Sequence, residues 1–246
     1  MAKRDSNPAA ETLAELDTLG DRLASWTAAN IRWVLTGAGL ALALAAGTGL
    51  YLDQQQRRAE AAFDALAQAQ TAFRDAMGAP EDSADIPEPA NPETARAART
   101  EAIERYRALA EEHAGTVAAT VAWLEAGSLQ EALGELDPAL ATWSGAVEGT
   151  EADQALRGIL LERIAGVHEA REAWSEAAEA HEQAADVPSY PLRWAALGEA
   201  ARCWVEAGEP ARALAAFDRL EAEAADHRLP DHVDFQLREL RAKPQG

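Results

Sequence analysis

The amino-acid sequence predicts an all-α protein in which one membrane-spanning helix precedes a stack of paired helices. A run of twenty residues without charge, 33–52, follows a short polar start. After residue 93 the chain is mostly Ala, Leu, Glu and Arg in helical register, without the alternation typical of strands. Small and aromatic residues in this part recur at a spacing of roughly 34 to 38 residues, which is typical of repeat architectures.

The N-terminal segment, residues 1–30, contains one stretch with helical periodicity. Between Glu11 and Ala29, large apolar residues fall three or four positions apart, with acidic residues between them. These apolar residues are Leu13, Leu16, Leu19, Leu23 and Trp26. We expect an amphipathic helix that packs on a partner or on itself, because helices that bind a membrane surface usually have a basic polar face.

Residues 31–52 form the expected transmembrane helix. At about 1.5 Å per residue, the uncharged run spans roughly 30 Å, which is the thickness of the hydrocarbon core of a bilayer. Trp33 and Tyr51 lie near its two ends, where aromatic rings favour the lipid–water interface. A cleaved signal peptide is the alternative, because Ala43-Leu44-Ala45 has the small-x-small form of a cleavage site. The long segment before the run and its continuation past this site favour an uncleaved anchor.

Small residues recur at every fourth position of the transmembrane segment, a pattern that lets two helices approach closely in lipid. One face carries Gly37, Ala41, Ala45 and Gly49, and the adjacent face carries Gly39, Ala43 and Gly47. Two interpretations remain open. The pattern indicates either a specific transmembrane partner or the high alanine content of the whole chain.

Residues 53–77 continue the helical pattern beyond the membrane. Phe63, Leu66, Gln70, Phe73 and Met77 alternate three and four positions apart and form a narrow apolar seam. We expect a helical stalk that serves as the first repeat helix and packs on the next helix of the chain; a short coiled-coil dimer is the alternative. Residues 78–93 contain four prolines and five acidic residues, which predicts an acidic, proline-rich loop.

The remaining residues, 94–246, match the tetratricopeptide pattern, in which small residues mark a helix crossing and a ring follows in the second helix. The clearest unit contains Trp123, Ala126, Gly127, Gly134, Ala139, Trp143 and Ala146. A later unit repeats the offsets in Leu197, Ala200, Ala201, Trp204, Gly208, Ala213, Phe217 and Leu220. The unit between them is degenerate and contains Leu161, Ile164, Ala165, His168, Ala177, His181 and Ala184. In this unit Glu172 replaces the glycine and His181 replaces the aromatic residue.

We therefore expect a tetratricopeptide-like α-solenoid of about four helix pairs. A single pair cannot bury its apolar face alone, so the pairs must stack and the end of the stack needs a cap. Val233, Leu237 and Leu240 at helical spacing, with Asp231 near the start, predict a C-terminal capping helix. An ordinary helical bundle is the alternative, because Ala-rich amphipathic helices produce a similar pattern.

The chain is strongly acidic, with 42 Asp and Glu against 22 Lys and Arg and a net charge of −20, almost all of it after residue 52. This field disfavours nucleic acid and favours cationic partners, although it serves solubility equally well. Cys203 is the only cysteine, which excludes an intrachain disulfide and a cysteine-based zinc site. Basic residues flank the apolar run about equally, so charge alone does not set its orientation.

The layout of residues 30–220 resembles a known family. A single N-terminal span, an extended first helix and the run Arg105–Thr116 (RYRALAEEHAGT), followed by an Ala-rich helix, are similar to YfgM-like membrane-anchored tetratricopeptide proteins, ancillary subunits of the bacterial SecYEG translocon. The acidic proline loop and the degenerate unit depart from a regular array. The resemblance implies a bacterial inner-membrane protein with a cytoplasmic N-terminus and a periplasmic repeat domain, which links Sec-exported chains to periplasmic chaperones. A scaffold for another envelope complex, in cell division or outer-membrane assembly, is the alternative.

The sequence indicates a protein without enzymatic activity, cofactor or small-molecule substrate. It contains no Gly-rich phosphate loop, no GxSxG and no HExxH. Ligand-type side chains gather before the predicted cap, at Asp226, His227, Asp231, His232 and Asp234. We interpret this cluster as a solvated loop, and an Asp/His metal-dependent hydrolase is the alternative from another class. His168 and His181 fall at core positions, where we expect them to pack.

The candidate binding surface is the concave face of the array, formed by inner positions of the first helix of each pair. Its residues are Val121, Leu124, Glu131, Ile159, Glu162, Glu169, Arg202, Val205 and Glu206. Apolar side chains among carboxylates suit a polypeptide segment that carries Lys or Arg beside hydrophobic residues, although the same carboxylates could simply solvate the surface. The Lys and Asn clamp with which other tetratricopeptide domains hold a C-terminal carboxylate is missing, so we do not expect that ligand.

Overall fold

The computed structural model describes residue 22 and residues 25–80, 85–151 and 154–242. The chain divides into two compact units, Met1–Arg57 and Arg58–Gly246, and each is described by itself. The amphipathic helix expected between Glu11 and Ala29 lies mostly outside the described residues, of which 25–29 are helical.

In the first unit, the residues from Ile31 onward form the N-terminal part of α2, Ile31–Ala76. Its apolar window has a mean hydropathy of 1.6, and none of it is buried within the protein. Among the described residues this is the one helix long and apolar enough to cross a membrane, judged by length and composition. The hydroxyls of Thr36 and Thr48 donate hydrogen bonds to carbonyls one turn earlier, so these polar groups are satisfied within the helix.

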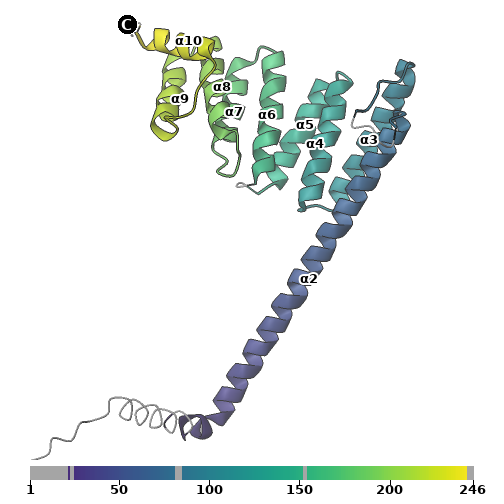
Figure 1. Cartoon of the computed structure of the whole chain (residues 1–246), viewed down its shortest axis with the longest axis vertical. Helices are drawn as coiled ribbons and strands as arrows, with labels where there is room; N and C mark the ends of the chain where they lie inside the picture. The colour runs from purple at the N-terminus through teal and green to yellow at the C-terminus, as the bar shows by residue number, and fades with distance from the viewer. Residues whose placement is uncertain (1–21, 23–24, 81–84, 152–153, 243–246) are drawn as a thin grey trace, which may run out of the picture. The chain divides into compact units, whose positions relative to one another are not determined.

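In the second unit, the described residues form helices and connecting turns, with no strand among them (Figure 1). The C-terminal part of α2 is followed by α3 (Pro92–Glu112), α4 (Val117–Ala132), α5 (Leu136–Gly149), α6 (Ala155–Ala170), α7 (Trp174–Ala185), α8 (Arg193–Glu206), α9 (Pro210–Glu223) and α10 (Asp231–Ala242). Each of these helices packs on its neighbour in the chain. The successive antiparallel pairs are α2 with α3, α4 with α5, α6 with α7, and α8 with α9, and α10 packs against α8 and α9.

Local sequence signals explain where several helices begin and end. The side chains of Asn91 and Thr116 accept hydrogen bonds from the first turns of α3 and α4, which otherwise have unpaired N–H groups. The turns after α4, α6 and α8 each require a left-handed residue. Gly134 and Gly208 adopt φ of 77° and 75° there, and Glu172 adopts 58° at the equivalent position of the degenerate unit.

The repeat positions inferred from the sequence form the packed core. The three alanines in the first turn of the second helices, Ala139, Ala177 and Ala213, are completely buried. One turn later, Trp143, His181 and Phe217 are also buried, so a histidine occupies the core position of a ring. The predicted fold class, a tetratricopeptide-like α-solenoid of about four helix pairs with a C-terminal capping helix, is confirmed.

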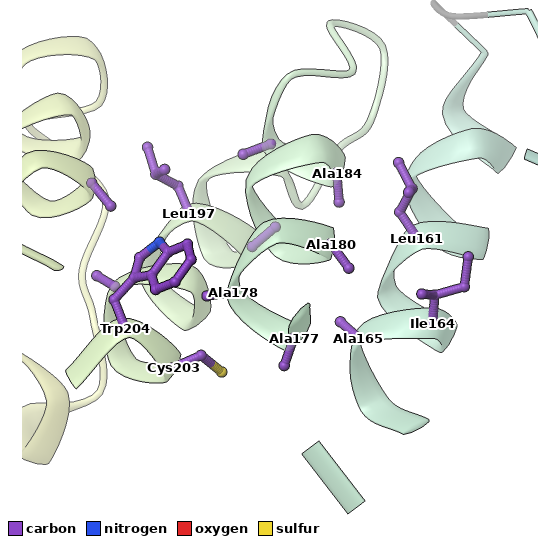
Figure 2. Close-up of a cluster of buried hydrophobic side chains, with 14 of the residues drawn as sticks. Leu161, Ile164, Ala165, Ala177, Ala178, Ala180, Ala184, Leu197, Cys203 and Trp204 are labelled. Atoms are coloured by element: carbon purple, nitrogen blue, oxygen red, sulfur yellow. The ribbon is translucent and has the colours of Figure 1, made fainter. Parts of the chain in front are cut away.

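Close helix crossings explain why small residues are required at particular positions. A Cβ atom added to Gly127 on α4 would lie 2.1 Å from the indole nitrogen of Trp143 on α5. The same indole donates a hydrogen bond to the Leu124 carbonyl at 3.2 Å, which fixes the ring against the glycine. Figure 2 shows the corresponding region around α7, where alanines face Leu161 and Ile164 on one side and Trp204 fills the other.

Candidate interaction surface

The nine residues expected to form the binding surface all lie on α4, α6 and α8, the first helices of three successive pairs, and α6 contacts both α4 and α8. We call these nine residues the first-helix face. Glu131 and Glu206 are exposed, while the apolar members are half-buried. Of the apolar members, Leu124, Ile159 and Val205 also pack against the hydrophobic core. These apolar side chains are therefore only partly available to a partner.

Three charged members of the first-helix face are engaged within the protein. His181 on α7 lies between two carboxylates of α6, with Nδ1 at 2.9 Å from Glu162 and Nε2 at 2.8 Å from Glu169. Glu169 also accepts a hydrogen bond from Arg202 on α8. Arg202 donates another hydrogen bond, of 2.6 Å, to Glu199. We call these five residues the His181 network. Glu162, Glu169 and Arg202 are therefore engaged in a network that ties three helices together.

The electrostatics of the His181 network follow from this geometry. Burial alone would lower the pKa of His181, but hydrogen bonds to Cys203, Glu162 and Glu169 raise it to about 11. The hydrogen bond with His181 outweighs the effect of burial and, together with Arg202, lowers the pKa of Glu169 to about 2. At neutral pH the ring is an imidazolium that donates from both nitrogens. His181 therefore packs in the core, as expected, and also holds α6 against α7.

Among the described residues, one group of potential metal ligands comes together, and it overlaps the His181 network. Atoms of Glu169, His181 and Cys203 lie within 4.8 Å of one another. Both ring nitrogens of His181 carry protons that are donated to carboxylates, and Arg202 already neutralises Glu169. A metal ion would have to displace a tightly held proton, so the arrangement fits an ion-pair network better than a metal site.

The Asp/His cluster, which lies just before α10 and in its first turn, contributes to a polar pocket of about 330 Å³ that is lined in part by Asp226, His227 and Asp231. Asp234 in the pocket accepts a hydrogen bond of 2.7 Å from Arg238. That hydrogen bond lowers the pKa of the Asp234 carboxyl. Within the described residues, the ligand atoms of this cluster do not come together as those around His181 do. Nothing in its geometry favours the hydrolase alternative.

Sequence reasoning missed a groove between α5, α6 and α7. It has a volume of about 430 Å³ and is lined by residues on a different face of α6 from Ile159, Glu162 and Glu169. Because three helices build it, no single stretch of sequence signals it.

Comparison with known proteins gives a distant structural likeness. No family model and no curated protein matches the chain. Among solved structures, the chain is similar to a Podosopora anserina protein described as a putative kinesin light chain with nearly identical TPR-like repeats, and to a single-residue variant of that protein. Identity is 18% in both cases, with 59% of this chain and 83% or 82% of the other covered, and the TM-score is 0.43. The fold assignment therefore rests on the helix pairs of this chain.

Proposed function

We propose that this protein is a membrane-anchored module for protein–protein interaction, and that it serves as an ancillary translocon subunit. The observation that carries the proposal is the composition of α2. Its N-terminal part is an exposed apolar helix of membrane-spanning length, and residues after 58 of the same helix form the first helix of the array. One continuous helix thus joins a bilayer anchor to a domain whose stacked pairs present extended surfaces.

In this proposal the N-terminus is cytoplasmic and the array lies in the periplasm, at the bacterial inner membrane. The array binds Sec-exported chains and passes them to periplasmic chaperones. Its acidic charge supports cationic polypeptides as partners, because an acidic surface attracts Lys- and Arg-rich segments and repels nucleic acid and anionic headgroups. The resemblance of the layout to YfgM-like proteins supports the translocon as the partner of the anchor.

The proposal is tested by purifying the full chain from membranes and identifying the proteins that accompany it. We expect translocon subunits to co-purify through the anchor, and Gly39→Leu with Gly47→Leu to remove them. Recovery of cell-division or outer-membrane assembly proteins instead would identify a different envelope scaffold. If the glycine variant keeps every partner, the spacing of these glycines reflects only the composition of the chain.

A second pair of substitutions tests whether the array itself binds cationic chains. Glu131 and Glu206 are exposed members of the first-helix face, so Glu131→Lys with Glu206→Lys leaves the His181 network intact. If this face binds basic segments, the variant should recover fewer exported chains and recover them with weaker dependence on salt. Unchanged recovery would exclude this face as the binding surface and leave the anchor's role untouched.

A further inference from the structure

The groove between α5, α6 and α7 has an apolar floor. Val147 on α5, Leu161 and Ile164 on α6, and Ala180 on α7 line its base. Figure 2 shows Ala180 pointing toward Leu161 and Ile164 across the space between the two helices. These four side chains are only 3–8% exposed, so the helices pack together at the floor and the groove of about 430 Å³ lies above that contact.

The rim of this groove is acidic. Glu148 on α5 and Glu176 on α7 line it and form no ion pair among the described residues. Glu179 on α7 pairs with Arg212 at 3.3 Å, but both side chains are about half exposed, so this ion pair is weak and can be exchanged. Three carboxylates therefore surround an apolar floor.

The two basic-type residues in the groove offset only part of this charge, because Arg157 is one cation against three carboxylates. Arg157 donates to the carbonyls of Val147 and Thr150 and so caps the C-terminal end of α5. Burial lowers the pKa of His168, which keeps its imidazole neutral at pH 7. The groove therefore repels anionic lipid headgroups and attracts cations.

We propose that this groove binds a cationic amphipathic helix of a partner polypeptide, with aliphatic side chains on the floor and Lys or Arg against Glu148 and Glu176. Residues along its walls follow helical steps, with Leu161, Ile164 and His168 on one side, so a helix can pack its ridge between them. This inference rests on the proposed function, since it assigns the site and the chemistry of the polypeptides that the array captures.

The test uses the full chain in phosphatidylcholine nanodiscs and a fluorescent helical peptide of Leu and Lys, with leucines three and four positions apart. Binding is followed by fluorescence anisotropy, and empty nanodiscs are measured in parallel to subtract lipid binding. Glu148→Gln with Glu176→Gln should weaken binding about fivefold and reduce its salt dependence, since two charge contacts are lost. The matched control, Glu104→Gln with Glu111→Gln on the exposed side of α3, removes the same charge elsewhere and should leave the affinity unchanged.

A third variant separates shape from charge. Val147→Ala removes part of the apolar floor and should weaken binding of the Leu/Lys peptide without changing its salt dependence. Equal weakening by the two glutamine pairs would mean that overall acidity alone attracts the peptide, and unchanged binding in the groove variants would exclude the groove.

A peptide of the same composition that contains prolines should bind poorly, and equal affinity would exclude a helical ligand. These results do not affect co-purification through the anchor, so failure of the groove is distinguishable from failure of the proposed function.

Discussion

Replacement of His181 by phenylalanine tests whether the His181 network stabilises the array. Two of the other helix pairs carry Trp143 and Phe217 at this position, so an aromatic ring fits the packing pattern. In the variant, Glu162 and Glu169 lose the imidazolium and Glu169 keeps only Arg202. His181→Phe thus removes two charge-assisted hydrogen bonds while preserving most of the buried volume.

The expected loss follows from opposing contributions. Two charge-assisted hydrogen bonds stabilise by about 1.5–3 kcal/mol each. The phenyl ring recovers roughly 1–2 kcal/mol through hydrophobic burial. The side chains of Glu162 and Glu169 are 28% and 26% exposed, so water partly replaces their lost partner. We expect the free energy of unfolding to fall by about 2–3 kcal/mol at pH 6.

The dependence of stability on pH is a sharper test than the loss itself. The pKa of His181 is raised from 6.5 to about 11, so the folded protein keeps a proton that the unfolded chain releases. Its contribution is complete below pH 6.5 and falls as the pH rises toward 11, by up to about 1.4 kcal/mol per pH unit. The pKa of Glu169 is lowered from 4.5 to about 2, so its contribution is present above pH 4.5 and is lost in acid.

Urea unfolding of the full chain in detergent, followed by tryptophan fluorescence at pH 7 and pH 9, measures this slope. The wild type should lose stability steeply between the two values, and His181→Phe should lose only what the other groups contribute. His168→Phe is the matched control, because the pKa of His168 is already lowered and its ring is neutral throughout this range. Equal slopes in the wild type and His181→Phe would refute the assignment of an imidazolium between two carboxylates.

Four further substitutions test the packing of the repeats. Gly127→Ala places a methyl group against Trp143 and should destabilise by about 1–3 kcal/mol, whereas Gly166→Ala, on an open helix surface, should stabilise by up to about 1 kcal/mol in thermal unfolding. Glu172→Gly relieves a left-handed residue and should raise the free energy of unfolding by about 1 kcal/mol; no gain would mean the turn is unstrained. Leu237→Ala opens the cap and should lower hydrogen-exchange protection in α9 but not in α4, because repeats contact only their neighbours; uniform loss would contradict an array.

Sequence reasoning predicted the array because its signal is local. Ala139, Ala177 and Ala213 recur at one offset, and each is small because two helices cross there. The same register predicted that Glu172 stands in a glycine position, which its positive φ confirms. The spacing of small residues along the sequence is therefore enough to predict the helix pairs.

The candidate site could be predicted only in part, because it depends on contacts between helices. Glu162 and Glu169 lie two turns apart on α6, and nothing in their spacing shows that one histidine on α7 reaches both. Arg202 comes from the next pair, so its ion pair with Glu169 appears only once the pairs are stacked. The groove is lined by residues of α5, α6 and α7, so it too appears only once these helices pack together.

The most direct test of a membrane-tethered array that binds polypeptides is photo-crosslinking in intact membranes during protein export. A photoreactive amino acid is placed at Glu176 on the groove rim, at Glu131 on the first-helix face, and at exposed Glu239 on α10 as the matched control. We predict adducts with exported chains at Glu176 or Glu131 and none at Glu239. Adducts at none of the three positions, or equal adducts at all three, would contradict binding by a defined surface of the array.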